Sequence, residues 1–148
     1  MKRISAALLA ATLLITGAAA GLASAAAKSE KLQLRKTKVG TILVDGRGFT
    51  VYAFTKDSHN RDACVPIREC PSIWPPLTSS GKALAGPGVR SSLIGTITIK
   101  GGAKQVTYAG HPLYTYTGDA SPGETSYVNF SAFGGRWPAV NASGGEVK

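Results

Sequence analysis

The sequence predicts a small all-β domain in which two pseudo-symmetric, strand-rich repeats pack on a shared core. Residues from 39 onward are rich in Val, Ile, Thr, Tyr and Phe and are interrupted by Gly and Pro, as in short strands joined by turns. No stretch shows the sustained apolar stripe of an amphipathic helix. Three landmarks also recur in the same order, which indicates an internal duplication.

The duplication is visible in three pairs of short segments. Residues 39–42 (Val-Gly-Thr-Ile) return as 94–97 (Ile-Gly-Thr-Ile), 52–57 return as 114–119, and 74–81 return as 137–144. The leading tyrosines, Tyr52 and Tyr114, are 62 positions apart. Half-domains of this size bury too little apolar surface to fold alone, so we expect the two copies to share one core.

The first 25 residues have the form of a secretory signal peptide. Lys2 and Arg3 precede an apolar run over residues 4–20, and Ala-Ser-Ala at 23–25 fits a small-residue cleavage site. The first cysteine is Cys64, so no lipidation cysteine follows the apolar run. We therefore expect a protein that is secreted or held in the cell envelope, with no transmembrane segment in the mature chain.

Residues 26–38 are interpreted as a flexible basic tail. The segment holds five of the cations behind the formal net charge of +9, and its one acid is Glu30. These cations are Lys28, Lys31, Arg35, Lys36 and Lys38. Such a tail either solubilises the domain or attaches it to an anionic cell-wall polymer or a membrane surface. No basic stripe with interleaved aromatic residues appears, so no specific nucleic-acid partner is expected.

Repeat 1 is expected to span residues 39–81. A strand over 41–44, a tight Asp-Gly-Arg-Gly turn at 45–48 and a return strand over 49–55 lead into an irregular arm. After this repeat, residues 82–92 are rich in Gly and Pro and are interpreted as the linker to the second copy.

The irregular arm of repeat 1 carries the only two cysteines of the chain, Cys64 and Cys70. An even number of cysteines behind a signal peptide predicts a disulfide, because exported compartments allow thiols to oxidise. The second copy has no cysteines at the matching place. The bond is therefore expected to brace an elaboration of repeat 1.

Repeat 2 is expected to span residues 93–145. The segments 95–100 and 104–108 flank a Gly-Gly pair and predict a hairpin, and a further strand is expected over 113–117. This copy has about seven extra residues between its Gly-Thr-Ile segment and its tyrosine. We interpret these extra residues as a longer hairpin.

The recurring motif sets aromatic residues ahead of an aspartate and a tryptophan. Its residues are Tyr52, Phe54, Asp57 and Trp74 in the first copy, and Tyr114, Tyr116, Asp119 and Trp137 in the second. One interpretation is structural: the aromatic rings fill the core, and each aspartate accepts backbone N–H bonds at a turn. The other is that tyrosine hydroxyls and aspartates line a polar pocket for a metal ion or a polar envelope ligand.

The residues offer little for catalysis or for a cofactor. The two histidines, His59 and His111, do not occupy matching positions in the copies and are interpreted as surface or turn residues. The sequence holds no nucleophile elbow, no His-Glu-x-x-His segment and no Gly-rich phosphate loop. We therefore expect no enzyme activity, no catalytic residue, no metal site and no cofactor.

The motif resembles that of the bacterial secreted-repeat proteins, a family of predicted lipoproteins with a Tyr-x-(Phe/Trp/Tyr)-x-x-Asp signature. Both copies satisfy this signature, at residues 52–57 and 114–119. The resemblance covers residues 39 to 144 and also includes the Cys64…Cys70…Trp-Pro-Pro segment. It implies an exported, wall- or membrane-associated bacterial protein of unknown biochemical role. This chain differs from the lipoprotein members because it lacks a lipidation cysteine.

Three functional interpretations remain open on the sequence alone. The first is a non-enzymatic binding or structural module of the envelope or the extracellular space. The alternative is a metal- or redox-associated periplasmic protein, which a shared pocket holding Asp57, Asp119 and a histidine would favour. The third is a glycan-acting enzyme, which would require both aspartates to converge in one cleft.

Overall fold

The computed structural model describes residues 28–147 as an all-β domain of four small sheets, which confirms the predicted fold class. The predicted signal segment over 1–25 lies outside the described residues. Over the described range the elements are β1 (Lys31–Thr37), β2 (Gly40–Val44), α1 (Cys70–Ile73), β3 (Leu84–Ala85), a 3-10 turn (Ser91–Leu93), β4 (Ile94–Thr98), β5 (Lys104–Tyr108), β6 (His111–Pro112), β7 (Phe130–Ala132), β8 (Gly135–Trp137), β9 (Ala139–Val140) and β10 (Glu146–Val147).

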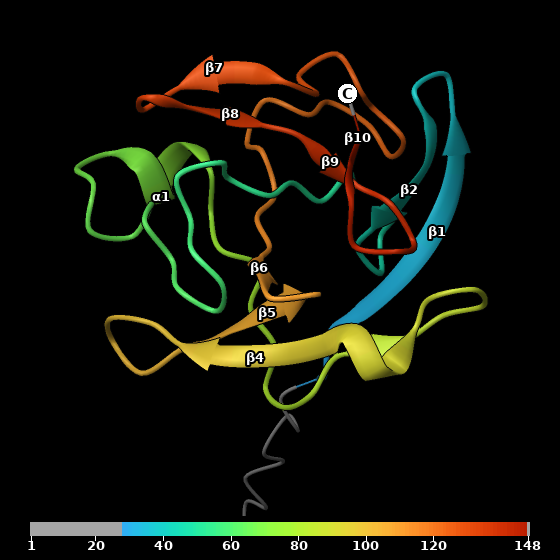
Figure 1. Ribbon diagram of the computed structural model, residues 1–148, viewed down its shortest axis with the longest axis horizontal. Helices are drawn as coiled ribbons and strands as arrows, with labels where there is room; N and C mark the ends of the chain where they lie inside the picture. The colour runs from blue at the N-terminus through green and yellow to red at the C-terminus, as the bar shows by residue number, and fades with distance from the viewer. Residues whose placement is uncertain (1–27, 148) are drawn as a thin grey trace, which may run out of the picture.

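Each half of the domain begins with an antiparallel hairpin. Strand β1 pairs with β2 over five residue pairs, and β4 pairs with β5 over five more. The second hairpin and the strand within 41–44 agree with the sequence prediction. In Figure 1 the β1–β2 hairpin lies along one side of the molecule and β4 runs along another, so the two hairpins flank a common centre.

The prediction of a flexible tail over 26–38 is wrong for most of that segment, because residues 31–37 form β1. Leu32 is fully buried in the core, and Leu34 packs against the same cluster. The two leucines alternate with polar residues, as expected for a strand with one buried face. Lys31 and Arg35 lie on the opposite face of the strand, and Lys36 follows the two leucines at its exposed end, so the charges leave the buried part of the strand intact.

The segment 82–92 is likewise part of the folded domain and not a free linker. Within it, β3 pairs in parallel with the start of β1, and Ala83 and Val89 are buried in the core. A 3-10 turn then leads directly into β4. The segment therefore ties the first hairpin to the second copy.

The Gly-Thr-Ile segments that match in sequence are not equivalent in the structure. The first, residues 40–42, lies in β2, the second strand of its hairpin, whereas residues 95–97 lie in β4, the first strand. The counterpart of β4 is β1, which starts 63 positions earlier. The extra residues inferred for repeat 2 are therefore no insertion, because repeat 1 has its own complete hairpin.

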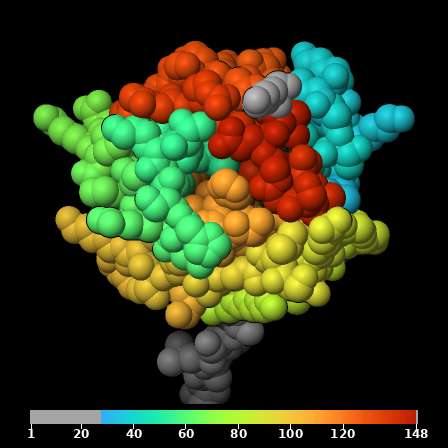
Figure 2. All heavy atoms as spheres, viewed as in Figure 1, coloured from blue at the N-terminus to red at the C-terminus, as the bar shows by residue number. Residues whose placement is uncertain are grey.

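The segments predicted as strands over 49–55 and 113–117 meet at the centre of the molecule through isolated bridges. The N–H of Tyr52 donates to the carbonyl of Tyr114 at 2.9 Å, and the N–H of Tyr114 donates back to the carbonyl of Tyr52 at 2.9 Å. This reciprocal pair relates equivalent residues of the two repeats. On the molecular surface, green atoms of the first repeat contact yellow and orange atoms of the second, which shows how closely the halves interlock (Figure 2).

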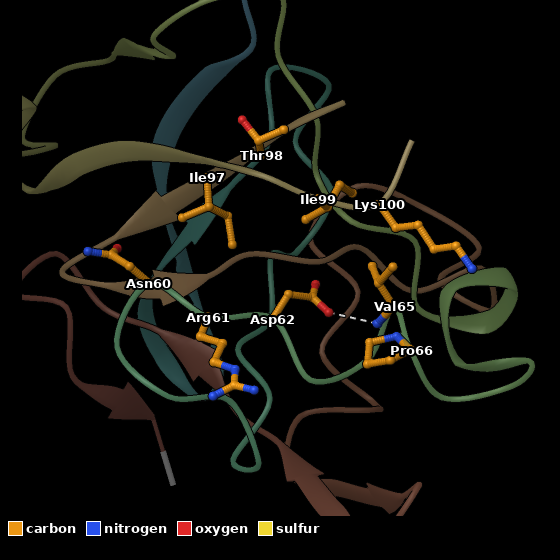
Figure 3. Close-up of a pocket in the computed structure, with 9 residues that line it drawn as sticks. All are labelled: Asn60, Arg61, Asp62, Val65, Pro66, Ile97, Thr98, Ile99 and Lys100. Atoms are coloured by element: carbon orange, nitrogen blue, oxygen red, sulfur yellow. Dashed lines mark hydrogen bonds between the residues drawn. The ribbon is translucent and has the colours of Figure 1, made fainter. Parts of the chain in front are cut away.

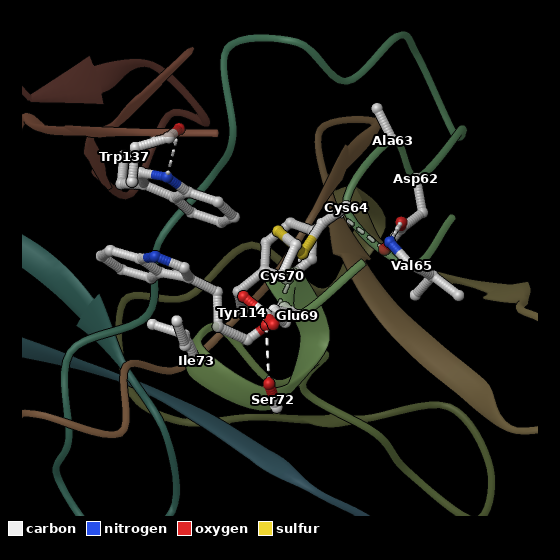
Figure 4. Close-up of a disulfide and its surroundings, with 12 residues drawn as sticks. Asp62, Ala63, Cys64, Val65, Glu69, Cys70, Ser72, Ile73, Tyr114 and Trp137 are labelled. Carbon is white, nitrogen blue, oxygen red and sulfur yellow. Dashed lines mark hydrogen bonds between the residues drawn. A yellow bond between two sulfur atoms is a disulfide. The ribbon is translucent and has the colours of Figure 1, made fainter. Parts of the chain in front are cut away.

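The predicted disulfide is present between Cys64 and Cys70, with a Cα–Cα distance of 5.4 Å. Both cysteines are fully buried, beside the rings of Tyr114 and Trp137 (Figure 4). The bond closes the arm that follows the first motif, and the short helix α1, which the sequence did not indicate, begins at Cys70. The arm is thereby held against the aromatic core.

We expect that replacing both cysteines with alanine lowers the free energy of unfolding by about 2 kcal/mol, because the unfolded chain regains the entropy of a short closed loop. Urea denaturation of the two proteins measures the difference. Dithiothreitol should produce a similar loss in the native sequence and no loss in the double variant. Equal stability of the reduced and oxidised proteins would contradict this role for the bond.

Candidate functional site

The two tyrosine–aspartate motifs exchange partners across the repeats. The hydroxyl of Tyr52 donates to Asp119, with O–O distances of 3.0 and 3.2 Å, and the hydroxyl of Tyr114 lies at the same two distances from Asp57. Each tyrosine therefore contacts the aspartate of the other copy. Two separate polar pockets, one within each copy, are not formed by these residues.

The pair around Tyr114 includes a second acid, Asp62. The Tyr114 hydroxyl oxygen lies 2.7 Å from Asp62 and 3.0 Å from Asp57, but a hydroxyl has only one proton to donate. One of the carboxyls must hold a proton for both contacts to be hydrogen bonds. Burial raises the pKa of Asp57 to about 7, and the nearby charge of Asp62 adds to that rise. Because its pKa is raised, Asp57 takes up this proton more readily as the pH falls below about 7.

The pair around Tyr52 is built in a similar way. Burial raises the pKa of Asp119 to about 6, and the negative charge of Glu124 contributes further. Glu124 follows Asp119 by five positions, just as Asp62 follows Asp57. Burial also raises the pKa of both tyrosines above the ordinary value, so their hydroxyls remain protonated donors.

The aromatic residues of the motif form one stack that crosses between the repeats. The indole rings of Trp74 and Trp137 lie parallel, 4.1 Å apart. Phe54 of the first copy stacks on Trp137 of the second at 4.2 Å, and Tyr116 of the second copy covers Trp74 of the first at 4.3 Å. This exchange agrees with the structural interpretation, in which the aromatic rings fill the core.

The edge contacts of the tyrosines complete the pseudo-symmetry. Tyr52 meets Trp74 edge to face and Tyr114 meets Trp137 edge to face, both with ring centroids 5.1 Å apart. The leading tyrosines and the tryptophans therefore occupy equivalent surroundings in the two copies. All eight predicted motif residues come together in one cluster at the interface between the repeats.

A cleft lined by cations lies outside this cluster, at the end of the first hairpin. We call it the basic cleft; it measures about 360 Å³. It is lined by Arg35, Lys36, Thr37, Lys38, Ser121, Pro122, Gly123, Glu124 and Thr125. Sequence reasoning found the cations but assigned them to a tail, and it did not identify the facing loop over 121–125.

A second cleft, which we call the apolar cleft, lies at the pseudo-symmetric place, between the hairpin of the second repeat and the arm of the first, and measures about 260 Å³ (Figure 3). It is lined by Asn60, Arg61, Asp62, Val65, Pro66, Ile97, Thr98, Ile99 and Lys100. Adding 62 to residues 35–38 gives 97–100, so the same strand end forms a wall of both clefts. No sequence signal had singled out these residues as a site.

The histidines do not join either motif pair. The ring of His59 lies so close to Gly110 that a Cβ at that position would collide with it, and His111 lies in β6. Among residues 28–147, no group of three or more His, Cys, Asp or Glu side chains is placed to hold a metal ion. No helix in the same range is long and apolar enough to span a membrane.

The raised pKa values of the aspartates predict how stability depends on pH. A carboxyl whose pKa is higher in the folded state binds a proton more readily there, so its contribution to stability falls as pH rises from about 4 to about 7. We expect the free energy of unfolding of the Asp57→Asn, Asp119→Asn double variant to decrease less over this pH range than that of the native protein. Urea denaturation across this pH range measures the comparison, and parallel pH profiles for the two proteins would contradict it.

The exchange of partners predicts a specific pattern of energetic coupling. Tyr52→Phe should lower the free energy of unfolding by about 1–2 kcal/mol, because a buried carboxyl loses its hydroxyl partner. In a double-mutant cycle, Tyr52→Phe should couple to Asp119→Asn. The matched cycle with Asp57→Asn, the aspartate of the same copy, should be close to additive. The reverse pattern would contradict the exchange.

The sequence matches the family model described as "secreted repeat of unknown function", once over residues 33–78 and again over 95–141. The first match begins inside β1 and the second inside β4, which agrees with the structural equivalence of these two strands. No curated protein and no solved structure matches the chain. Two matches that together cover more than half of the sequence show that the protein belongs to this family of secreted repeats.

Proposed function

We propose that this protein is a non-enzymatic module that binds anionic polymers of the cell envelope through its basic cleft. The observation that carries the proposal is that Arg35, Lys36 and Lys38 line one cleft at the end of the β1–β2 hairpin. Membership of a family described as secreted supports the proposal, because an exported protein would meet such polymers outside the cytoplasm.

The three cations are exposed and available for a partner. Among residues 28–147 the ion pairs are Arg47–Asp45, Arg68–Glu69 and Arg136–Glu146, so none of the three cations takes part in one. Like charges that line the same cleft repel one another, and a bound polyanion would relieve that repulsion. Lys38 acts on Glu124 only weakly across the cleft, and the pKa of Glu124 is lowered chiefly by the hydroxyl of Ser126.

The backbone around Arg35 supports a defined position for its guanidinium group. A Cβ at Gly123 would lie 2.7 Å from the Arg35 Nε, and one at Gly48 would lie 2.9 Å from its Nη1. Both glycines have positive φ values, +80° and +90°, so the turns and the close approach both require glycine. An arginine held in this way can present its planar donors to a phosphate or carboxylate.

The tyrosine–aspartate motif supports a scaffold role in this proposal. Its hydroxyls and carboxyls bond to each other at the repeat interface, and none of its eight residues lines either cleft. Each of the two aspartates bonds to a tyrosine of the other copy and lines neither cleft, which favours a structural role over that of a glycan-cleaving pair. Binding therefore falls to the loops and strand ends outside the motif.

The test compares equal losses of charge in the two clefts. We expect the Lys36→Gln, Lys38→Gln double variant to bind polyphosphate about five-fold more weakly at low salt and to show a weaker salt dependence. The control is Lys100→Gln combined with Lys104→Gln, which removes the same charge near the apolar cleft. Fluorescence anisotropy with labelled polyphosphate measures the binding of both double variants. Labelled polygalacturonate provides the same measurement for a carboxylate polymer. An equal loss of binding in the control would show that binding depends only on net charge, which would contradict the proposal.

A further inference from the structure

We propose that the apolar cleft is a separate binding site, which takes a small aliphatic carboxylate such as the C-terminal end of a short peptide. This proposal concerns other residues than the basic cleft and does not depend on polymer binding. It follows from the different lining that each repeat gives to the same position of the duplicated scaffold.

The wall supplied by the second hairpin is apolar where the wall supplied by the first is basic. Ile97 and Ile99 stand where the first repeat has Arg35 and Thr37, and Thr98 stands where it has Lys36. Lys100, the counterpart of Lys38, is the one cation at this strand end. Half-buried isoleucines beside a cleft offer apolar surface for a ligand, which the basic cleft does not.

The opposite wall comes from the arm of the first repeat, where Val65 and Pro66 add further apolar surface (Figure 3). This wall is fixed before any ligand binds. Val65 follows Cys64 of the disulfide, and its N–H donates to the Asp62 carboxylate at 2.6 Å. A preformed wall reduces the entropy lost on binding, which matters for a ligand small enough for a cleft of about 260 Å³.

The charges around the cleft favour an anionic group on the ligand. Arg61 and Lys100 are exposed at its rim and belong to no ion pair among residues 28–147. Asp62 also lines the cleft, but its two oxygens accept from the Val65 N–H and contact the Tyr114 hydroxyl. The acid is therefore engaged with the protein, whereas the two cations are available to a carboxylate.

The ligand chemistry follows from these two features together. Apolar surface on both walls selects short aliphatic side chains, and the rim cations select a terminal carboxylate. A highly charged polymer would bind weakly in the apolar cleft, because the wall over residues 97–100 lacks most of the cations of the basic cleft. The two clefts thus differ in the class of ligand that their linings complement.

The probe is acetyl-Ala-Ala, and its C-terminal amide is the matched control. With the full exported chain labelled with ¹⁵N, we expect saturable amide shifts in residues 60–66 and 97–100 at millimolar probe concentrations. The amide should bind about five-fold more weakly, because it lacks the charge that pairs with Arg61 or Lys100. Equal binding of acid and amide, or no shifts in these residues, would overturn the proposal.

Protein variants separate this site from the basic cleft. Arg61→Gln and Lys100→Gln should each weaken binding of acetyl-Ala-Ala about three-fold, whereas Lys38→Gln, the counterpart of Lys100, should leave it unchanged. Ile97→Arg, Ile99→Thr, which copies the first repeat, should abolish the shifts. Thermal melting of each variant confirms that it is folded. A loss with Lys38→Gln equal to that with Lys100→Gln would show only a response to net charge and overturn the assignment.

Discussion

The domain depends on the exchange of side chains between its two repeats. A tyrosine from each copy gives its hydroxyl to an aspartate of the other, and each tryptophan is covered by a ring from the opposite copy. Neither half can bury its own tryptophan or satisfy its own aspartate in the same way. The repeats therefore form one cooperative unit and not two small domains joined in tandem.

The exchange also determines where the clefts lie. Five positions after each motif aspartate the arm brings a second acid, Asp62 or Glu124, to the edge of the buried cluster. Asp62 contacts the Tyr114 hydroxyl directly, while Glu124 acts on the Tyr52 pair through its charge. Each cleft thus lies beside a tyrosine–aspartate pair, although no motif residue lines either cleft.

The duplicated scaffold leaves its periphery free to diverge. The central rings and hydrogen bonds must match in both copies, because each copy completes the other. The strand ends and the arms have no such constraint, so one cleft carries three cations and the other two isoleucines. The disulfide belongs to this variable layer, since it braces only the arm that follows the first motif.

The strand-rich composition, the duplicated motif and the single disulfide were all predictable from the sequence. These features depend on residue type and local spacing, and local patterns persist in the folded protein. The strand β1 was not predictable from charge, because only the buried Leu32 and the partly buried Leu34 distinguish it from a basic tail. Only the pairing of this segment with β2 identifies it as a strand, and a count of charges carries no information about pairing.

Only the tertiary structure decided which residues are partners. The Gly-Thr-Ile segments match in letters but occupy different strands, because strand register depends on long-range pairing and not on local identity. The tyrosine of one motif could have met the aspartate of either copy, and the pseudo-symmetric packing selected the opposite one. The clefts arise for the same reason, since each combines a strand end and an arm that are far apart in the chain.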